Sequence, residues 1–310
     1  MKNRDITCLF TLAALWGASY LFMRIGAGEF GALTMAGARA AGASLLLLPL
    51  LAARQDGGLR ALRHYWKPIA LVGITNSALP FVLFGFAALS INASLSAIFN
   101  AATPLYAAII GLLWLREDIS AKRATGLALG FAGVLWLAWD NASFKDGANT
   151  FATCWAIAAC MAATVLYAFS AHYTRQYLAN VPPLAVATGS QLISALVLAA
   201  PAVIWRPVAM PSAHAWLALL ALTVICTALA YVLFFRLIAA VGASSTMTVP
   251  FLVPAFGVLW GLLFLDEIFT LKMAAGSSLI VLGTALTTGL IRYNSRTSAI
   301  STSTLTTTKL

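Results

Sequence analysis

The chain has 310 residues, of which 61% are apolar and only 9% are charged, and its formal net charge is +10. Water-soluble domains contain about 25% charged residues, so this composition excludes an ordinary soluble protein and indicates an integral membrane protein. Basic residues concentrated on one side of a membrane explain the positive charge without a nucleic-acid partner.

Apolar runs predict ten membrane-spanning helices. A span needs about 20 apolar residues, and the uncharged run 68–115 is about twice that long, so we divide it at a break near residues 90–93. The ten predicted spans are 6–26, 33–53, 68–89, 93–115, 123–140, 151–172, 182–204, 215–238, 243–265 and 271–291. Residues 292–310 are rich in Ser and Thr and are expected to form a disordered cytoplasmic tail.

The first span begins like a signal peptide, because Lys2 and Arg4 precede an apolar run. We interpret it as a membrane helix, since its removal would leave nine spans and break the repeat described next. The four cysteines all fall within predicted spans and lack metal-ligand spacing. We therefore expect them to pack as small apolar side chains, and we expect no metal and no cofactor.

The basic residues indicate the orientation of the chain. With the N-terminus inside, 14 of the 19 Lys and Arg residues are cytoplasmic, and three, Lys145, Arg206 and Lys272, are outside. This asymmetry follows the positive-inside rule and predicts that both termini are cytoplasmic.

The two halves of the chain repeat each other. Residues 92–134 align with 242–284 without a gap at an offset of 150, and 13 of the 43 positions are identical. An offset of 152 aligns Pro49 with Pro201 and Arg39 with Gln191. We predict two five-helix repeats, at 1–140 and 151–291, and an odd helix number inverts the second relative to the first. Inverted repeats favour alternating access, although a gene duplication without mechanistic consequence would leave the same pattern.

Three stretches carry a resemblance to a known family. They resemble EamA-type members of the drug/metabolite transporter superfamily. The stretches are LWGASYLFMR (15–24), NAATPLYAAIIGLLWLRED (100–118) and the run from Tyr231 to Glu267. The resemblance covers residues 6–291 and implies a ten-helix secondary carrier, commonly a bacterial inner-membrane exporter of amino acids or other small metabolites. The sequence lacks the G-x-x-x-x-G-K-[ST] nucleotide-binding loop, so ATP is not the expected energy source.

Polar residues at helical spacing predict where a substrate would bind. In a membrane such residues face protein or an aqueous cavity, because exposure to lipid is costly. We expect a cavity with aromatic walls and a few hydrogen-bonding groups, whereas each aromatic residue taken alone fits ordinary packing. The predicted substrate-binding residues are Trp16, Ser19, Tyr20, Arg39, Asn76, Pro80, Ser96, Asn100, Thr103, Thr164, Tyr167, Thr227, Tyr231, Thr246, Pro250 and Pro254. The second, fifth, seventh and tenth spans lack such polar rows.

The ninth span contains two prolines, Pro250 and Pro254. Proline leaves the carbonyl four residues earlier without its donor, which a membrane tolerates only where another group satisfies it. We expect the freed carbonyls of Thr246 and Pro250 to face the centre. A packed kink without ligand contact is the alternative.

Arg39 is the charged residue on which our substrate prediction depends. It lies about six residues into the second span, near the predicted periplasmic end. It either contacts a helix-end carbonyl or the headgroups, or gives the cavity mouth a positive potential, since the spans hold no Asp or Glu away from their ends. The second alternative predicts that zwitterionic amino acids or small carboxylates are carried in preference to lipophilic cations.

Other classes of function are less consistent with the residues. An intramembrane enzyme would need a nucleophile, metal set or carboxylate pair at depth, and His172 lies near a cytoplasmic boundary. A channel fits the repeat less well than a carrier does. Two pairs of glycines permit close helix packing, either within the chain or in a homodimer. They are Gly126 with Gly130 and Gly257 with Gly261.

Overall fold

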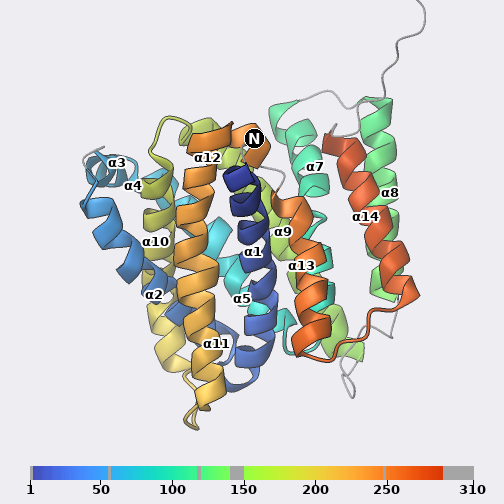
Figure 1. The fold of residues 1–310 in the computed structure, drawn as a ribbon, viewed down its shortest axis with the longest axis horizontal. Coiled ribbons are helices and arrows are strands. Elements are labelled where there is room, and N and C mark those ends of the chain that lie inside the picture. Colours follow the sequence, from blue (N-terminus) through green and yellow to red (C-terminus); the bar gives the residue numbers. More distant parts are fainter. Residues whose placement is uncertain (1–2, 55–56, 117–119, 140–149, 247–248, 289–310) are drawn as a thin grey trace, which may run out of the picture.

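The computed structural model describes residues 3–54, 57–116, 120–139, 150–246 and 249–288. Within these ranges the regular elements are all helical, and most helices run roughly parallel or antiparallel to one another (Figure 1). The bundle is what a chain of long apolar segments must form in a membrane, because a helix satisfies its own backbone hydrogen bonds.

The first half of the described chain consists of five long helical segments and one short helix. Two of the long segments are built from consecutive pieces. In chain order the elements are α1 (Asn3–Phe30), α2 (Ala32–Ala52), α3 (Gly58–His64), α4 (Trp66–Gly73), the π-helical turn η1 (Ile74–Ala78), α5 (Leu79–Ala87), α6 (Ala93–Asn100), α7 (Thr103–Leu115) and α8 (Ala121–Trp139).

The second half follows the same order of long segments. A π-helical turn again interrupts the third of them. The elements are α9 (Thr150–Tyr177), α10 (Pro183–Ile204), α11 (Ala213–Thr223), the π-helical turn η3 (Val224–Leu229), α12 (Ala230–Thr246), α13 (Val249–Phe264) and α14 (Leu271–Thr288).

Seven helical segments are long and apolar enough to cross a membrane, and they coincide with seven of the predicted spans. Two shorter apolar helices, Val249–Phe264 and Leu271–Thr287, fall within the ninth and tenth predicted spans. The boundary of the ninth span was wrong. Residues 243–246 continue α12, and α13 begins at Val249.

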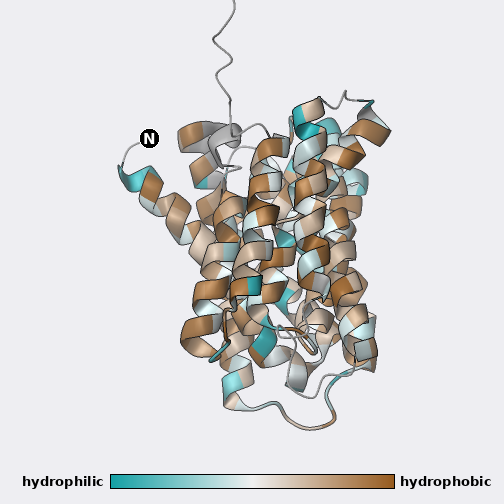
Figure 2. Cartoon of the chain, turned by 90° about the vertical axis from the view of Figure 1, so that its right-hand side faces the viewer, coloured by the Kyte–Doolittle hydropathy of each residue, from teal (hydrophilic) through white to brown (hydrophobic). Residues whose placement is uncertain are grey.

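The outer surface of the bundle is apolar. Leu113 is 74% exposed and Leu271 is 87% exposed. In Figure 2 brown hydrophobic residues dominate the helices, and hydrophilic residues gather mostly toward their ends. In water each such side chain would cost ~25 cal/mol per Å² of apolar area, whereas lipid tails accept it without this penalty. The chain is a multi-pass membrane protein.

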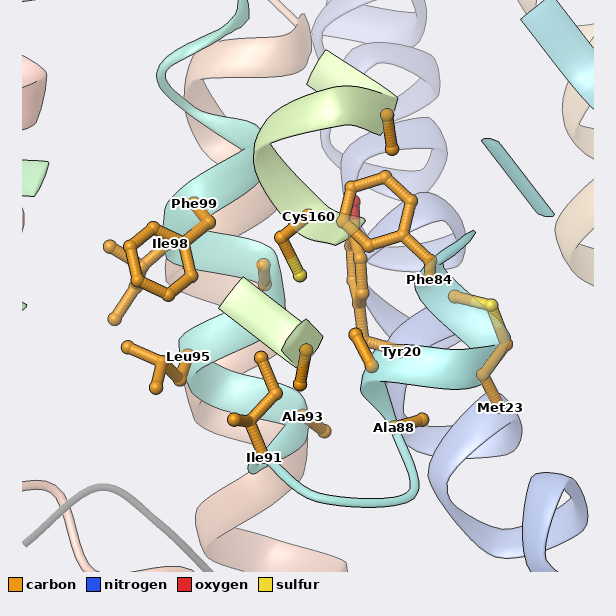
Figure 3. Close-up of a cluster of buried hydrophobic side chains, with 14 of the residues drawn as sticks. Tyr20, Met23, Phe84, Ala88, Ile91, Ala93, Leu95, Ile98, Phe99 and Cys160 are labelled. Atoms are coloured by element: carbon orange, nitrogen blue, oxygen red, sulfur yellow. The ribbon is translucent and has the colours of Figure 1, made fainter. Parts of the chain in front are cut away.

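The main apolar core joins the two halves. Its buried side chains come from α1, α2, α5, α6, α7 and α8 in the first half and from α9, α11, η3, α13 and α14 in the second. Figure 3 shows part of it, where Phe99, Ile98 and Leu95 lie on one side of Cys160, and Phe84 and Tyr20 lie on the other. Both halves must therefore fold together to bury this surface.

Glycines bring α8 and α14 into backbone contact. A side chain at Gly283 would collide with the backbone of Gly126 and Gly130, and one at Gly133 would meet the carbonyl oxygen of Gly276 at 2.7 Å. The two helices lie side by side in Figure 1. Gly126 and Gly130 thus serve packing within the chain, one of the two alternatives that the sequence left open.

A second pair of glycines has the same use in α13. A side chain at Gly257 would collide with Ala97 of α6, and one at Gly261 would collide with Ser94 and Glu267. A side chain at Gly17 of α1 would approach the backbone nitrogen of Gly257 to 2.9 Å. The homodimer predicted as an alternative is not needed to explain either pair.

Carboxylates cap two helix starts across the halves of the chain. Glu267 accepts hydrogen bonds from the backbone N–H groups of Ala93 (2.7 Å) and Ser94 (2.9 Å) and from the Ser94 hydroxyl. Glu29 accepts from the Ser212 hydroxyl at 2.8 Å, next to the start of α11. Negative charge at a helix N-terminus is favourable because the free N–H groups point toward it. Glu267 therefore lies at the start of α6, where its charge is favourable.

Gly283→Ala should destabilise the protein, because the new methyl group would meet backbone atoms that cannot rotate away. We expect a loss of about 1–3 kcal/mol, typical of overpacking, seen as a lower thermal midpoint in detergent. Gly28→Ala is the matched control, since nothing lies within 4 Å of the added carbon. Equal midpoints for the two variants would contradict close packing of α8 and α14.

Candidate functional site

Arg39 occupies the interior of the bundle. It lies seven residues after the start of α2, about 10 Å along the helix, and only 6% of its surface is exposed. The expectation that it reaches a helix end or the headgroups is therefore wrong. Its burial comes from the neighbouring elements, because α1, α5 and η3 all supply side chains that contact it.

The contacts of Arg39 come from several helices and contain one strong hydrogen bond. Its Nε donates to the hydroxyl of Thr227 at 2.8 Å, and its guanidinium carbon lies 3.8 Å from the centre of the Phe81 ring. Nη1 faces the sulfur of Met23 at 4.0 Å, which is a weak contact. Within the described ranges these contacts include no carboxylate. A buried guanidinium that is not paired with a carboxylate is costly and favours the approach of an anion.

Three predicted tyrosines surround this guanidinium. Tyr20, Tyr167 and Tyr231 all lie close enough to interact electrostatically with Arg39. Phe84 connects two of them, because its ring lies 5.4 Å from that of Tyr20 and 6.1 Å from that of Tyr167. Tyr20 and Phe84 face each other in Figure 3. The aromatic walls that the sequence predicted thus meet at Arg39.

π-helical turns supply the polar groups at the centre. η3 contains Thr227, and η1 contains Asn76 and Ser77. The Thr227 hydroxyl also donates to the carbonyl oxygen of Leu222, five residues earlier, at 2.8 Å. A π-helical turn inserts one residue into a helix and occurs frequently at functional sites. Both turns put a hydroxyl where the opposite half of the chain can reach it.

The seventh span contains a buried polar row that we did not predict. In α10, Thr188, Gln191 and Ser194 are all completely buried, and Gln191 donates from Nε2 to the Ser77 hydroxyl at 2.9 Å. The statement that this span lacks a polar row was wrong. The three-residue spacing from 188 to 191 to 194 was visible in the sequence, but short hydroxyl residues in an apolar run resemble small packing residues.

The fourth and sixth spans contribute fewer free groups than predicted. Asn100 reaches the Tyr20 hydroxyl, and Ser96 is buried without a hydrogen-bond partner. Thr103 donates to the carbonyl oxygen of Asn100, and Thr164 donates to that of Met161, both at 2.7 Å. These two hydroxyls satisfy their own helices, so the structure gives them no free donor for a ligand.

The two prolines of the ninth span have different positions in α13. Pro250 is the second residue of the helix, where a missing N–H is not needed, and Pro254 is the proline inside the helix. The carbonyl oxygen of Val253, next to Pro254, lies near Gly17 of α1. That the carbonyl of Pro250 faces the centre stays a prediction. The side chain of Thr246 lies outside the described residues.

The remaining predicted residues differ in their surroundings. Trp16 packs on Phe234, with ring centres 5.4 Å apart, away from the contacts of Arg39. Pro80 is buried at the start of α5, and Ser19 is buried without a hydrogen-bond partner. Seven predicted residues are therefore linked around the centre, namely Tyr20, Arg39, Asn76, Asn100, Tyr167, Thr227 and Tyr231.

The described residues contain no group of three or more His, Cys, Asp and Glu side chains that could hold a metal ion. The candidate site is accordingly one arginine, three phenols and several neutral hydrogen-bonding groups. Such groups can bind and orient a small molecule.

Family comparison agrees with this architecture. Residues 4–139 and 154–289 each match the EamA-like transporter family. The chain belongs to this family and contains two copies of its repeat. The crystal structure of another protein has the same fold, with a TM-score of 0.64 and 19% identity, over 94% of this chain and 98% of that one.

Two Bacillus subtilis proteins are similar to this chain. One is named an uncharacterized transporter, YvbV, and is 27% identical over 297 residues, covering 90% of both chains. The other is named multidrug resistance protein EbrA and is 39% identical over 75 residues, which are 24% of this chain and 70% of EbrA. Both names agree with membership in a membrane transporter family.

Thr227→Val should lower the thermal midpoint of the protein more than Thr223→Val does. Valine keeps the shape of threonine but removes the acceptor of Arg39 at position 227, whereas Thr223 bonds to the carbonyl oxygen of Leu219 in its own helix. Leaving Arg39 unpaired should cost about 1–3 kcal/mol, measured as a lower thermal midpoint in detergent. The site geometry would be wrong if both variants lost the same stability.

Proposed function

We propose that this protein is a secondary transporter that exports amino acids or related small carboxylates across a bacterial inner membrane. In this proposal ten membrane helices form two inverted five-helix repeats, at 1–140 and 151–291, which rock around a central site. The direction of transport rests on the family resemblance.

The packing of the helices supports two equivalent halves. α2 packs against α10, and α8 packs against α14, so the second and fifth helices of each half contact their own counterparts. α1 packs against α13 just as α9 packs against α7. Equivalent halves that contact each other in this way can exchange conformations, which is the usual basis of alternating access.

Arg39 is the observation on which the substrate class depends. Its positive charge lies in the interior, and its contacts among the described residues are a hydroxyl, a sulfur atom and an aromatic ring. A carboxylate could accept two parallel N–H bonds from the guanidinium and neutralise it. Met23, Met35 and Phe81 close around Arg39 so tightly that no water-sized space remains, so the helices must separate to admit a ligand.

A second candidate function is export of lipophilic cations. The similarity to EbrA favours it, because that protein is named for multidrug resistance. A buried positive charge opposes it, since a cation beside Arg39 would be repelled in a medium of low dielectric constant. A channel would differ from both by conducting current without saturation.

Both termini are proposed to be cytoplasmic. The start of α1 and the short helix α3 lie at one end of the bundle, and the connection between α13 and α14 lies at the other (Figure 1). α3 and its flanks hold Arg60, Arg63 and Lys67, which agrees with a cytoplasmic location.

Cysteine labelling tests this topology. In a cysteine-free background, Ile268→Cys, which is 77% exposed between α13 and α14, should react with an impermeant maleimide in intact cells. Leu59→Cys, which is 42% exposed in α3, should react only after the membrane is opened. The reverse pattern would contradict the proposed orientation.

Arg39→Gln tests the substrate class and copies the residue at the equivalent position of the other half. In proteoliposomes we expect uptake of an amino acid or small carboxylate to fall by about tenfold, because a charged hydrogen bond is lost. A panel of amino acids, organic acids and cationic dyes, with and without a pH gradient, identifies the substrate class. Export of a quaternary ammonium dye that Arg39→Gln leaves undiminished would overturn the proposal and support the second candidate.

A further inference from the structure

Gln191 has the same set of contacts as Arg39, with the two halves exchanged. Arg39 donates to the hydroxyl of Thr227 and lies over the ring of Phe81. Gln191 donates to the hydroxyl of Ser77 at 2.9 Å and reaches the hydroxyl of Tyr231 at 3.5 Å.

The sequence offsets confirm that these are equivalent positions. Arg39 and Gln191 are 152 residues apart, while Ser77 with Thr227 and Phe81 with Tyr231 are each 150 apart. Both hydroxyls that accept the hydrogen bonds lie in π-helical turns, Ser77 in η1 and Thr227 in η3. The centre of the protein therefore holds two copies of one arrangement, and they differ in chemistry.

In the arrangement around Gln191, one hydrogen-bond acceptor has no donor. Its Oε1 has no hydrogen-bond partner, although the side chain is completely buried. An amide oxygen without a donor is unfavourable in an apolar interior, and a protein keeps such a group where something else satisfies it. A donor from a ligand would remove this cost.

The two copies approach each other along one helical segment. Thr227, which accepts from Arg39 at 2.8 Å, and Tyr231, which Gln191 reaches at 3.5 Å, are one helical turn apart in the continuous segment formed by η3 and α12. A cationic donor and a neutral acceptor therefore lie against neighbouring turns of the same segment. A ligand that bridges them needs an anionic group and a hydrogen-bond donor a short distance apart.

We propose that Gln191 is a specificity-determining residue whose amide oxygen accepts a hydrogen bond from the ammonium group of the substrate. This assignment rests on the proposed function, because it requires the carboxylate of the same molecule to bind Arg39. Gln191 then distinguishes an amino acid from an otherwise identical acid that lacks the amino group. A site built to pair a donor rejects the analogue without it, since the buried acceptor stays unmatched.

The test compares pairs of ligands that differ by one amino group. Binding to the purified full-length protein is measured by calorimetry for leucine and 4-methylpentanoate and for phenylalanine and 3-phenylpropanoate. Gln191→Met keeps the length of the side chain but removes the acceptor. We expect it to weaken binding of the amino acids by about fivefold or more, and to change binding of the deaminated acids by less than about twofold.

Ser190→Ala is the matched control, because Ser190 is another buried polar residue of α10 and its hydroxyl already donates to the carbonyl oxygen of Ala187 in its own helix. It should leave both members of each ligand pair unchanged. Gln191→Leu is a second variant for the case that Gln191→Met does not fold, which size-exclusion chromatography reports.

The outcomes separate this inference from the proposed function. An equal loss for both members of each pair, or no loss at all, would assign Gln191 to packing and overturn the inference. Arg39→Gln should weaken both members of each pair. Unchanged binding in that variant would overturn the proposed function and the Gln191 inference with it, whereas an equal loss in Gln191→Met overturns the inference alone. If the wild-type protein binds none of these acids, both proposals fail.

Discussion

A guanidinium buried among aromatic rings is the constraint on which the centre of this protein depends. Arg39 is 6% exposed, and its one strong hydrogen bond goes to Thr227, in the opposite half of the chain. Removing a charge from water is unfavourable unless other groups pair with it, so the surrounding helices have to supply polar atoms at that depth. The π-helical turn η3 does so by aiming the Thr227 hydroxyl at Arg39, and η1 provides the equivalent hydroxyl of Ser77 for Gln191.

The rest of the fold keeps the two halves in contact while leaving this centre poorly satisfied. Glycines bring α8 against α14 and α1 against α13, and Glu267 ties the start of α6 to the chain after α13. In contrast, the hydroxyls of Ser19, Ser96, Thr188 and Ser194 and the amide oxygen of Gln191 are buried without partners. Packing is therefore close where the two halves meet, whereas several buried polar groups are left without a partner.

The inward position of several candidate site residues could be predicted because the membrane restricts what a polar residue can do. Asn76, Asn100, Tyr167 and Tyr231 recur on polar faces, and lipid cannot satisfy such faces, so they had to turn inward. The same argument failed for Thr103 and Thr164, whose hydroxyls bond to carbonyls of their own helices. A short hydroxyl side chain readily donates to a carbonyl of its own helix, so its place on a polar face says little about ligand contact. The five donors of a guanidinium need partners from other elements, which makes a buried Arg39 more informative.

The sequence by itself determined the membrane class, the approximate extents of the long apolar helices, the family and the two repeats, because each follows from composition, hydrophobic length or residue identity. Only the tertiary structure decided the burial of Arg39, the contacts of Gln191 and the start of α13 at Val249. Burial and pairing both depend on which helices of the two halves meet. A buried row such as Thr188, Gln191 and Ser194 gains its meaning from Ser77 and Tyr231, which lie far from it in the chain and next to it in the fold.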